Sequence, residues 1–486
     1  MQYKWTVLTV TTVGVLMSGL DGRIVLIGLP TVAAALHADA EQAIWFTQAY
    51  TLGSTVALLF IGRVSDVFGR VKVYSIGFSV FTVGSLLTSL SGNPDAFIAS
   101  RIFQGLGASA LFANSAAIIT DAFPRGQLGT ALGINQIAFR VGSVTGLTVS
   151  GLILTFLNWR YLFYINIPIG IFGTLWAAAR LHELNKHDNP PPMDWVGVTS
   201  FLVFITTLLL ALTFAAYGLG DLLLVAILLA ASAGTLVIFV RNEVRSANPA
   251  LDLNLLRIRE FTGGIVAQLL NALAWGAFLL VISLYLQLVK GLTPLQAGFA
   301  ILPFDVAFLL VGPLSGRFSD KYGTIPFTTA GLALISLSLF IFSRTSVSTP
   351  YSLVAADLVL GGAGSGLFTS PNISSIMSSV PSAERGVASA VRAIFFNVGY
   401  VLSFNIIILI MAQTIPYSEI TGIISALNPS TIPEVERAAF SASLSRVYVV
   451  LTVVNAAAII PSALRGRSVR EPEPSSNSAE AMQDVD

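Results

Sequence analysis

Long apolar segments with few or no charges recur along the whole chain, and they constrain its fold more than any other feature. Each is about 20 residues long, the length of helix that crosses the ~30 Å hydrocarbon layer of a bilayer. Charged residues make up only 10% of the 486 residues and hydrophobic residues 54%, whereas soluble domains carry about 25% charged residues. Because a backbone in lipid must satisfy its own hydrogen bonds, these segments indicate an all-α integral membrane protein.

Fourteen such segments can be counted. The first starts near Trp5 and continues to about Leu29 without a small-residue cleavage site, so we interpret it as a membrane-spanning helix and not as a signal peptide. The others lie near residues 44–62, 73–91, 96–120, 127–156, 160–180, 195–216, 221–240, 261–287, 295–316, 324–343, 350–377, 386–411 and 446–464. The sequence therefore predicts 14 transmembrane helices.

The distribution of basic residues orients these helices. An even number of spans puts both termini on one side of the membrane. If that side is the cytoplasm, most of the 26 Lys and Arg residues fall in inner loops or tails, and few fall outside. The outer ones are Arg160, Lys290, Arg344 and Arg437. By the positive-inside rule, we expect a multi-pass protein of the cell (plasma) membrane with cytoplasmic N- and C-termini.

Three spaced patterns occur twice, in the same order. The segment 62–69 matches the segment 316–323, which lies 254 residues later. Patterns that include Gly105 and Phe139 recur after 256 and 257 residues. The nearly constant offset predicts two six-helix halves with two helices inserted between them, a known transporter design. The predicted units are an N-terminal half at 1–181, a cytoplasmic linker with helices 7 and 8 at 182–257, a C-terminal half at 258–467 and a disordered cytoplasmic tail at 468–486.

Several motifs resemble those of the major facilitator superfamily. The loop at 62–70 resembles that superfamily's signature between helices 2 and 3, G-x-x-x-D-x-x-G-R, and residues 101–107 match its R-x-x-Q-G-x-G pattern in helix 4. Segments 20–30 and 159–168 resemble helices 1 and 6 of the fourteen-helix drug:proton antiporters, the EmrB/QacA group. The resemblance covers nearly all of residues 5–465. It implies the major-facilitator fold and a transporter that works by alternating access.

Helix 5 carries the glycine pattern of that antiporter group only in part. Gly133, Gly142, Gly146 and Gly151 match it, and small residues at this spacing let helices approach closely. We expect these four glycines to serve helix packing. Leu147 stands where the group has proline. Since proline kinks a helix, this departure bears on how helix 5 bends and on antiport.

The resemblance also implies a gate at the cytoplasmic end of helix 2. An acidic side chain there can cap the N-terminus of a facing helix and hold the inner mouth shut. Ordinary positive-inside topology is the alternative interpretation, but it explains only the basic residues. The residues assigned to gating are Gly62, Asp66, Gly69, Arg70, Lys72 and, in the second half, Asp320.

A charge at bilayer depth normally faces a cavity or a partner, and the helices that carry the deepest charged residues line the central cavity in the superfamily resembled. These residues are Asp21, Arg23, Arg101, Arg140, Asp305, Asp357 and Arg392. All of them except Arg101 are assigned to the predicted substrate cavity. The repeat adds Asn135 and Asn397, which align with Arg392 and Arg140. Asp357 occupies the repeat position of Arg101. An ion pair between the halves and a role in transport are two equally supported alternatives for Asp357.

Asp21, Asp305 and Arg101 are predicted to couple transport to protons. Desolvation disfavours the charged form of a buried carboxylate, so such a group can take up a proton near neutral pH. Asp21 and Arg23 are two residues apart on a helix and point to opposite faces, so each needs a partner on another helix. The alternative is a permanent structural ion pair of Asp21 with Arg101 or Arg140.

Arg140 and Arg392 bear on the charge of the substrate. A buried arginine stays protonated and presents a planar fork that suits carboxylate or phosphate. If both are free, we expect a substrate that is anionic, zwitterionic or rich in acceptor oxygens. If instead they neutralise Asp21, Asp305 or Asp357, the cavity is nearly uncharged.

Other kinds of site lack support in the sequence. The chain has no cysteine, so it has no disulfide or thiolate ligand, and its three histidines, His37, His182 and His187, are too scattered for a metal cluster. The net charge of +1 argues against nucleic-acid binding. The glycine-rich run at 361–366 lies within a predicted span, with no strand before it and no Walker lysine, so we expect no nucleotide binding. We expect no cofactor, no metal and no enzymatic activity.

The leading hypothesis is a monomeric secondary active transporter that exports small amphipathic compounds or drugs in exchange for protons. Its expected partners are the small-molecule substrate, protons and the lipid bilayer. The alternative within transport is a facilitator or proton symporter for an organic anion or metabolite. A hypothesis of another class is a non-transporting membrane receptor or sensor, whose mark would be a large folded soluble domain.

Overall fold

The computed structural model describes residues 3–184, 194–217, 221–246, 253–380, 385–413 and 434–466. Within these ranges all regular secondary structure is helical, as predicted. The predicted tail at 468–486 lies outside the described residues, and so does His187. Thirteen helices of the described part are long and apolar enough to cross a membrane. With α2, which is 29 residues long, the predicted count of fourteen is confirmed.

The first six crossings form the N-terminal half. They are α1 (Tyr3–Ala35), α2 (Ala40–Phe68), α3 (Arg70–Leu90), α4 (Pro94–Ala122), α5 (Arg125–Phe156) and the pair α6 (Tyr161–Tyr164) and α7 (Asn166–Arg180). Two inserted helices follow, α8 (Trp195–Tyr217) and α9 (Leu222–Arg245), which pack against each other.

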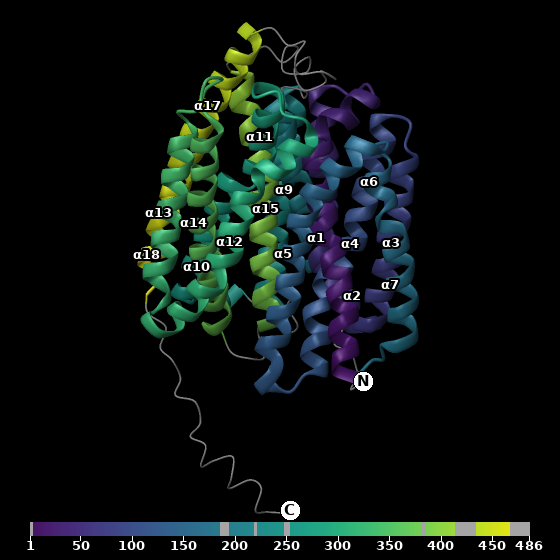
Figure 1. The fold of residues 1–486 in the computed structure, drawn as a ribbon. Coiled ribbons are helices and arrows are strands. Elements are labelled where there is room, and N and C mark those ends of the chain that lie inside the picture. The colour runs from purple at the N-terminus through teal and green to yellow at the C-terminus, as the bar shows by residue number, and fades with distance from the viewer. Residues whose placement is uncertain are drawn as a thin grey trace, which may run out of the picture.

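The last six crossings form the C-terminal half. After the short η1 (Leu253–Arg257), the first crossing consists of α10 (Arg259–Trp275), α11 (Phe278–Leu284) and the π-helical η2 (Tyr285–Val289). The others are α12 (Pro294–Tyr322), α13 (Thr324–Phe342), α14 (Tyr351–Ser378), α15 (Arg385–Ala412) and the pair α17 (Glu434–Ala457) and α18 (Ile459–Leu464). Figure 1 shows the two halves side by side, with helices that run roughly parallel.

The predicted repeat is visible in the local structure of the two halves. Asp39 and Gln42 form a capping box at the start of α2, and Thr293 and Gln296 form one at the start of α12, 254 residues later. At the other ends of these helices, Gly69 and Gly323 both have a positive φ, 101° and 89°. A residue with a side chain is strained in this conformation, so glycine is required at both turns.

Close backbone contacts also repeat. A side-chain carbon at Gly142 of α5 would lie 2.2 Å from the carbonyl oxygen of Leu16 in α1. At Gly399 of α15 it would lie 2.7 Å from the carbonyl oxygen of Leu269 in α10. The absence of a side chain thus lets α5 and α15 lie directly against the first helix of their own half.

The other three glycines of helix 5 differ among themselves. Gly146 contacts Leu20 of α1 in the same way as Gly142. Gly151 lies against Leu295 of α12, so it packs one half on the other. Gly133 has open space where a side chain would be, and the structure does not place it at a packing contact.

The two halves contact each other at the end of the bundle farthest from the start of α1. There Ser283 donates to the carbonyl of Leu26 (3.2 Å) and Gln287 donates to that of Ile27 (3.3 Å). Gln48 of α2 donates to Asn405 Oδ1 of α15 at 2.8 Å. These contacts join helices of opposite halves and hold this end of the bundle together.

Candidate functional site

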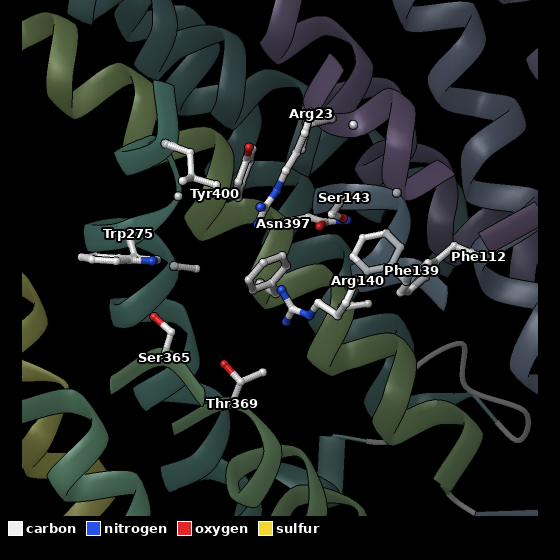
Figure 2. A pocket seen from close by; sticks show the side chains of 18 of the residues that line it. Arg23, Phe112, Phe139, Arg140, Ser143, Trp275, Ser365, Thr369, Asn397 and Tyr400 are labelled. Carbon is white, nitrogen blue, oxygen red and sulfur yellow. The ribbon is translucent and has the colours of Figure 1, made fainter. Parts of the chain in front are cut away.

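A cavity of about 280 Å³ lies between the two halves. It is lined by α1, α2, α4 and α5 on one side and by α10, α12, α14 and α15 on the other. Of the residues that the sequence predicts for a substrate cavity, five line it: Arg23, Arg140, Asp305, Arg392 and Asn397. Figure 2 shows Arg23 and Arg140 reaching into it, with Phe139 on one side and Trp275 on the other.

One ion pair crosses this cavity from half to half. Arg23 Nη1 of α1 lies 3.1 Å from Asp305 Oδ1 of α12. The Asp305 side chain is only 5% exposed, and its second oxygen, Oδ2, has no hydrogen-bond partner among the described residues. One oxygen of this carboxylate is therefore paired with a cation of the opposite half. The other oxygen can accept a hydrogen bond or a proton.

Two further arginines face the cavity without a carboxylate partner in the described part of the chain. The Arg140 guanidinium carbon lies 4.2 Å from the centre of the Phe308 ring, a distance at which a cation and an aromatic face attract each other. Arg140 interacts electrostatically with two cations, Arg23 and Arg392, and with one anion, Asp305. Arg392 Nε is buried without a hydrogen-bond partner. The cavity wall is thus rich in positive charge.

Nine aromatic side chains also line the cavity. These rings are Tyr50, Phe112, Phe139, Trp275, Phe304, Phe308, Phe368, Phe396 and Tyr400. Phe112 and Phe139 meet edge to face with centroids 5.9 Å apart. Ligand sites are commonly apolar and aromatic with a few placed polar groups. This wall suits a compound with a flat ring system.

Asp21 and Arg101 lie outside the cavity, in a buried polar network of the N-terminal half. Arg101 Nη1 donates to Asp21 Oδ2 at 2.6 Å, and the two residues are 1% and 0% exposed. Gln104 and Asn166 donate to Asp21 Oδ1 at 3.0 and 2.7 Å. Both also donate to Ser85 Oγ. Of the two structural partners that the sequence left open for Asp21, the structure shows Arg101.

The Asp21 network, which consists of Asp21, Ser85, Arg101, Gln104 and Asn166, joins α1, α3, α4 and α7. Tyr50 connects it to the cavity, because its ring lies 4.5 Å from the Arg101 guanidinium and also lines the cavity wall. The family motifs contain Gln104 and Asn166. Ser85 and Tyr50 belong to no motif, so sequence analysis missed them.

Asp357 and Asn135 also lie elsewhere than predicted. Asp357 is 4% exposed, does not line the cavity, and neither of its carboxylate oxygens has a hydrogen-bond partner among the described residues. Within the described part of the chain, Asp357 does not form the ion pair between the halves that the repeat left open. Asn135 is buried below the cavity wall and accepts from Ser115 Oγ at 3.1 Å. Both side chains are buried among packed helices and do not face the cavity.

At the cytoplasmic end predicted for α2, acidic residues outside the family signature make the contacts. Arg70 Nη1 lies 2.9 Å from Asp121 Oδ2 of α4. Glu183 Oε1 accepts from the backbone nitrogens of Val71 and Lys72 at 2.8 and 3.1 Å, so it caps the N-terminus of α3. The sequence assigned the capping role to Asp66 and did not predict this contact of Glu183.

Of the other residues assigned to gating, the structure describes the surroundings of Gly62, Gly69 and Lys72. A side-chain carbon at Gly62 would meet nothing within 4 Å, and the Lys72 side chain is exposed. The side chains of Asp66 and Asp320 lie outside the described part of the structure. Among the described residues, no group of His, Cys, Asp and Glu could hold a metal ion.

Comparison with known proteins gives a family match over most of the chain. The family model described as Major Facilitator Superfamily matches residues 11–404. The chain is 32% identical over 419 residues to the riboflavin transporter RibZ of Clostridioides difficile (strain 630), covering 86% of this chain and 91% of RibZ. It is 31% identical over 404 residues to the multidrug resistance protein Stp of Mycobacterium tuberculosis (strain CDC 1551 / Oshkosh), covering 82% and 74%.

Solved structures share the fold at low sequence identity. An auto-inhibited POT family peptide transporter aligns with a TM-score of 0.69 and 16% identity, covering 98% of this chain and 99% of that one. A bacterial homologue of the human lysosomal transporter Spinster aligns with a TM-score of 0.67 and 14% identity, covering 96% and 97%.

Proposed function

Because this chain belongs to the Major Facilitator Superfamily, we propose that it is a secondary transporter that exports small amphipathic compounds in exchange for protons. It is a multi-pass membrane transporter and not an enzyme. The observation that carries the proposal is the cavity between the halves, crossed by the Arg23–Asp305 ion pair. Relatives named for drug resistance and efflux support export.

The contacts between the halves support an inward-facing state. With the N-terminus in the cytoplasm, the contacts of Leu26 and Ile27 with Ser283 and Gln287 close the outer end. A substrate would then enter the cavity from the cytoplasm. Rocking of the halves about the cavity, which breaks these outer contacts, would expose it to the outside.

Asp305 is the better placed of the two predicted proton carriers. It lines the cavity, so protons that enter the cavity can reach it, and its Oδ2 has no partner in the described structure. Protonation would remove its charge and weaken the ion pair with Arg23 across the halves. Loss of that contact would favour separation of the halves, which links proton uptake to the conformational change.

Asp21 would act with Arg101 in the same cycle, one layer behind the cavity wall. Its carboxylate accepts hydrogen bonds from three side chains, so it is held in one position. Tyr50 lies between Arg101 and the cavity. A bound substrate that moves Tyr50 would disturb the Asp21–Arg101 pair, and this supplies a route by which substrate and proton influence each other.

The contacts at the inner end of α2 would serve as the gate. Arg70 pairs with Asp121, and Glu183 caps α3. Both contacts lie within the N-terminal half, so they hold the α2–α3 turn in place for contact with the other half. We propose that Asp66 and Asp320, together with Gly62, Gly69 and Lys72, complete this gate in the outward-facing state.

The alternative within transport is a facilitator or proton symporter for an organic anion. The arginine-rich cavity wall favours it, and RibZ is named as a riboflavin transporter. A non-transporting receptor or sensor is the hypothesis of another class. Transport assays distinguish the facilitator or symporter, and also the receptor or sensor, from an exporter.

The test is dye transport into proteoliposomes with and without an imposed pH gradient, using ethidium, rhodamine 123 and fluorescein. We expect Asp305→Asn to lower gradient-driven transport of an accepted dye at least about tenfold while dye counterflow without a gradient persists, because only proton coupling is removed. Asp95→Asn, an exposed carboxylate in the first turn of α4, is the matched control and should not change either rate.

Three outcomes would count against the proposal. Gradient-driven transport that persists in Asp305→Asn but is lost in Asp21→Asn would move the coupling role to Asp21. Dye flux that never responds to the gradient would support a facilitator. No flux of any dye, together with specific binding, would support a receptor.

A further inference from the structure

We propose that the cavity contains an anion subsite between Arg140 and Arg392, and that the substrate is a flat aromatic compound carrying a carboxylate, phosphate or enolate oxygen. This inference rests on the proposed transport function. It differs from the cation preference that an acidic cavity would give. The anionic group would lie between the two guanidinium groups, and the ring system would lie against the aromatic wall.

The first support is the charge of the cavity wall. Three arginines line it, Arg23, Arg140 and Arg392, against the single carboxylate of Asp305. That carboxylate is already paired with Arg23. Arg140 therefore has only the Asp305 carboxylate, which Arg23 already pairs with, and Arg392 has no carboxylate partner among the described residues. A charge that is withdrawn from water without a full counter-charge is costly. An anionic ligand would supply the missing charge.

The second support is the arrangement of hydrogen-bond donors. Arg392 Nε is buried and has no hydrogen-bond partner among the described residues. A buried donor that lacks a partner favours a ligand that accepts from it. The Arg140 guanidinium lies over the Phe308 ring at 4.2 Å, which holds its plane in place before a ligand arrives. A guanidinium in a set orientation binds carboxylate or phosphate through two parallel hydrogen bonds.

The third support is the position of the two arginines in the repeat-related helices. Arg140 belongs to α5 of the N-terminal half and Arg392 to α15 of the C-terminal half. Their charges repel across the cavity. An anion between them would turn this repulsion into attraction for both, and would thereby draw the two halves together around the ligand. Substrate charge would then influence the closing of the cavity as well as binding.

The shape of the ligand follows from the surrounding rings. Phe139 and Phe112 form one wall, and Trp275 forms part of the opposite one (Figure 2). Aromatic side chains favour stacked or edge-to-face contact with another ring. Thr369 and Ser365 supply hydroxyl groups on the Trp275 side, so a ring system with oxygen or nitrogen acceptors fits better than a hydrocarbon.

The experiment compares two dyes with the same tricyclic xanthene ring, fluorescein, which is anionic at pH 8, and rhodamine 123, which is cationic. Their dissociation constants are measured on purified full-length protein in detergent. We expect wild type to bind fluorescein more tightly. Arg140→Gln and Arg392→Gln should each weaken fluorescein binding about tenfold or more, and should leave rhodamine 123 binding unchanged or improved.

Two controls separate the subsite from a structural role. Arg344→Gln removes an exposed arginine that also lies over a phenylalanine ring, Phe340 at 5.1 Å, and should change neither dissociation constant. Arg140→Lys keeps the charge but loses the planar fork, and should fall between wild type and Arg140→Gln. The thermal unfolding temperature of each variant shows whether it is folded.

Two results would overturn the inference. One is tighter binding of rhodamine 123 than of fluorescein by wild type. The other is an equal loss for both dyes in Arg140→Gln and Arg392→Gln, together with lower thermal stability. Gradient-driven transport of rhodamine 123 alone would leave the proposed function intact and remove the anion subsite. Charge-selective binding without any transport would leave the anion subsite intact and contradict the proposed transport function.

Discussion

Arg101 in α4 and Asp357 in α14 occupy corresponding places in the two halves, 256 residues apart, and their surroundings differ. Arg101 donates to Asp21 and to Gln104, so a charge at this depth is matched by a charge and by hydrogen bonds. Asp357 is buried to a similar degree, and neither of its oxygens has a partner in the described structure. One half thus contains a complete polar network, and the other contains an isolated carboxylate.

The sequence explains this difference through the repeat. At an offset of 254 residues, which also relates Gly77 of α3 to Gly331 of α13, Leu339 stands where Ser85 stands in the first half. At the offset of 256 residues, Leu360 stands where Gln104 stands. Two polar members of the network, Ser85 and Gln104, therefore have leucine as their counterpart in the second half.

Both halves nevertheless keep the same helix packing. Gly107 of α4 lies against Gly77 of α3, and Gly364 of α14 lies against Gly331 of α13 at the corresponding places. Helix packing at small residues is thus independent of the polar network, which adds rigidity to one half only. A carboxylate without a partner is costly at this depth, so we expect Asp357 to destabilise the second half.

The largest expected effect tests the polar network. Asp21→Leu should lower the free energy of unfolding by about 3–5 kcal/mol, because it leaves Arg101 buried without a counter-charge. Unfolding in increasing SDS measures this loss. The double variant Asp21→Leu/Arg101→Leu should recover part of it. Asp95→Leu at the exposed start of α4 is the control, and a loss as small as the control's would show that the ion pair adds no stability.

A smaller loss is expected when a network residue of the first half is exchanged for its counterpart in the second half. Gln104→Leu removes the donor to Asp21 and Ser85, and should cost about 2 kcal/mol. The same SDS titration measures it. The reverse exchange, Leu360→Gln, should cost less, because the new amide can reach Asp357 one turn away. Equal losses would mean that the two surroundings do not differ in their need for polar partners.

The packing that the halves share should respond alike on both sides. Gly142→Ala and Gly399→Ala should each cost about 1–2 kcal/mol, because the added carbon would collide with a carbonyl of the neighbouring helix. Gly133→Ala, where a side chain meets open space, should cause no loss and even a gain of up to about 1 kcal/mol from helix propensity. The stability of the three variants is compared by thermal unfolding in the same detergent. A loss confined to one half would contradict the shared packing.

The smallest expected effect has the opposite sign. Asp357→Leu should raise the free energy of unfolding by about 1 kcal/mol, because it removes two buried oxygens that have no hydrogen-bond partner. The measurement is the same SDS titration, beside Asp21→Leu. A loss of stability that matches Asp21→Leu would show that Asp357 has a partner of its own, and the contrast between the halves would disappear.

The helix count, the two halves and the family could be predicted from the sequence, because they depend on local signals. Hydropathy over about 20 residues indicates a membrane span wherever it occurs. The repeated spacing of 62–69 and 316–323 can be recognised in the sequence without knowing any contact. The sequence also showed which charged residues lie at depth. It left open whether each of them faces a cavity or a partner.

Only the tertiary structure decided the partners of those charges. Periodicity places Asp21 and Arg23 on opposite faces of α1, but the rotation and depth of the neighbouring helices determine that Arg101 meets the first and Asp305 the second. The same arrangement leaves Asp357 without a partner. Tyr50, Phe308 and Glu183 gain their importance from what lies beside them, and no motif marks them. A sequence determines which face of a helix a residue occupies, whereas the packing of the other helices determines what that face meets.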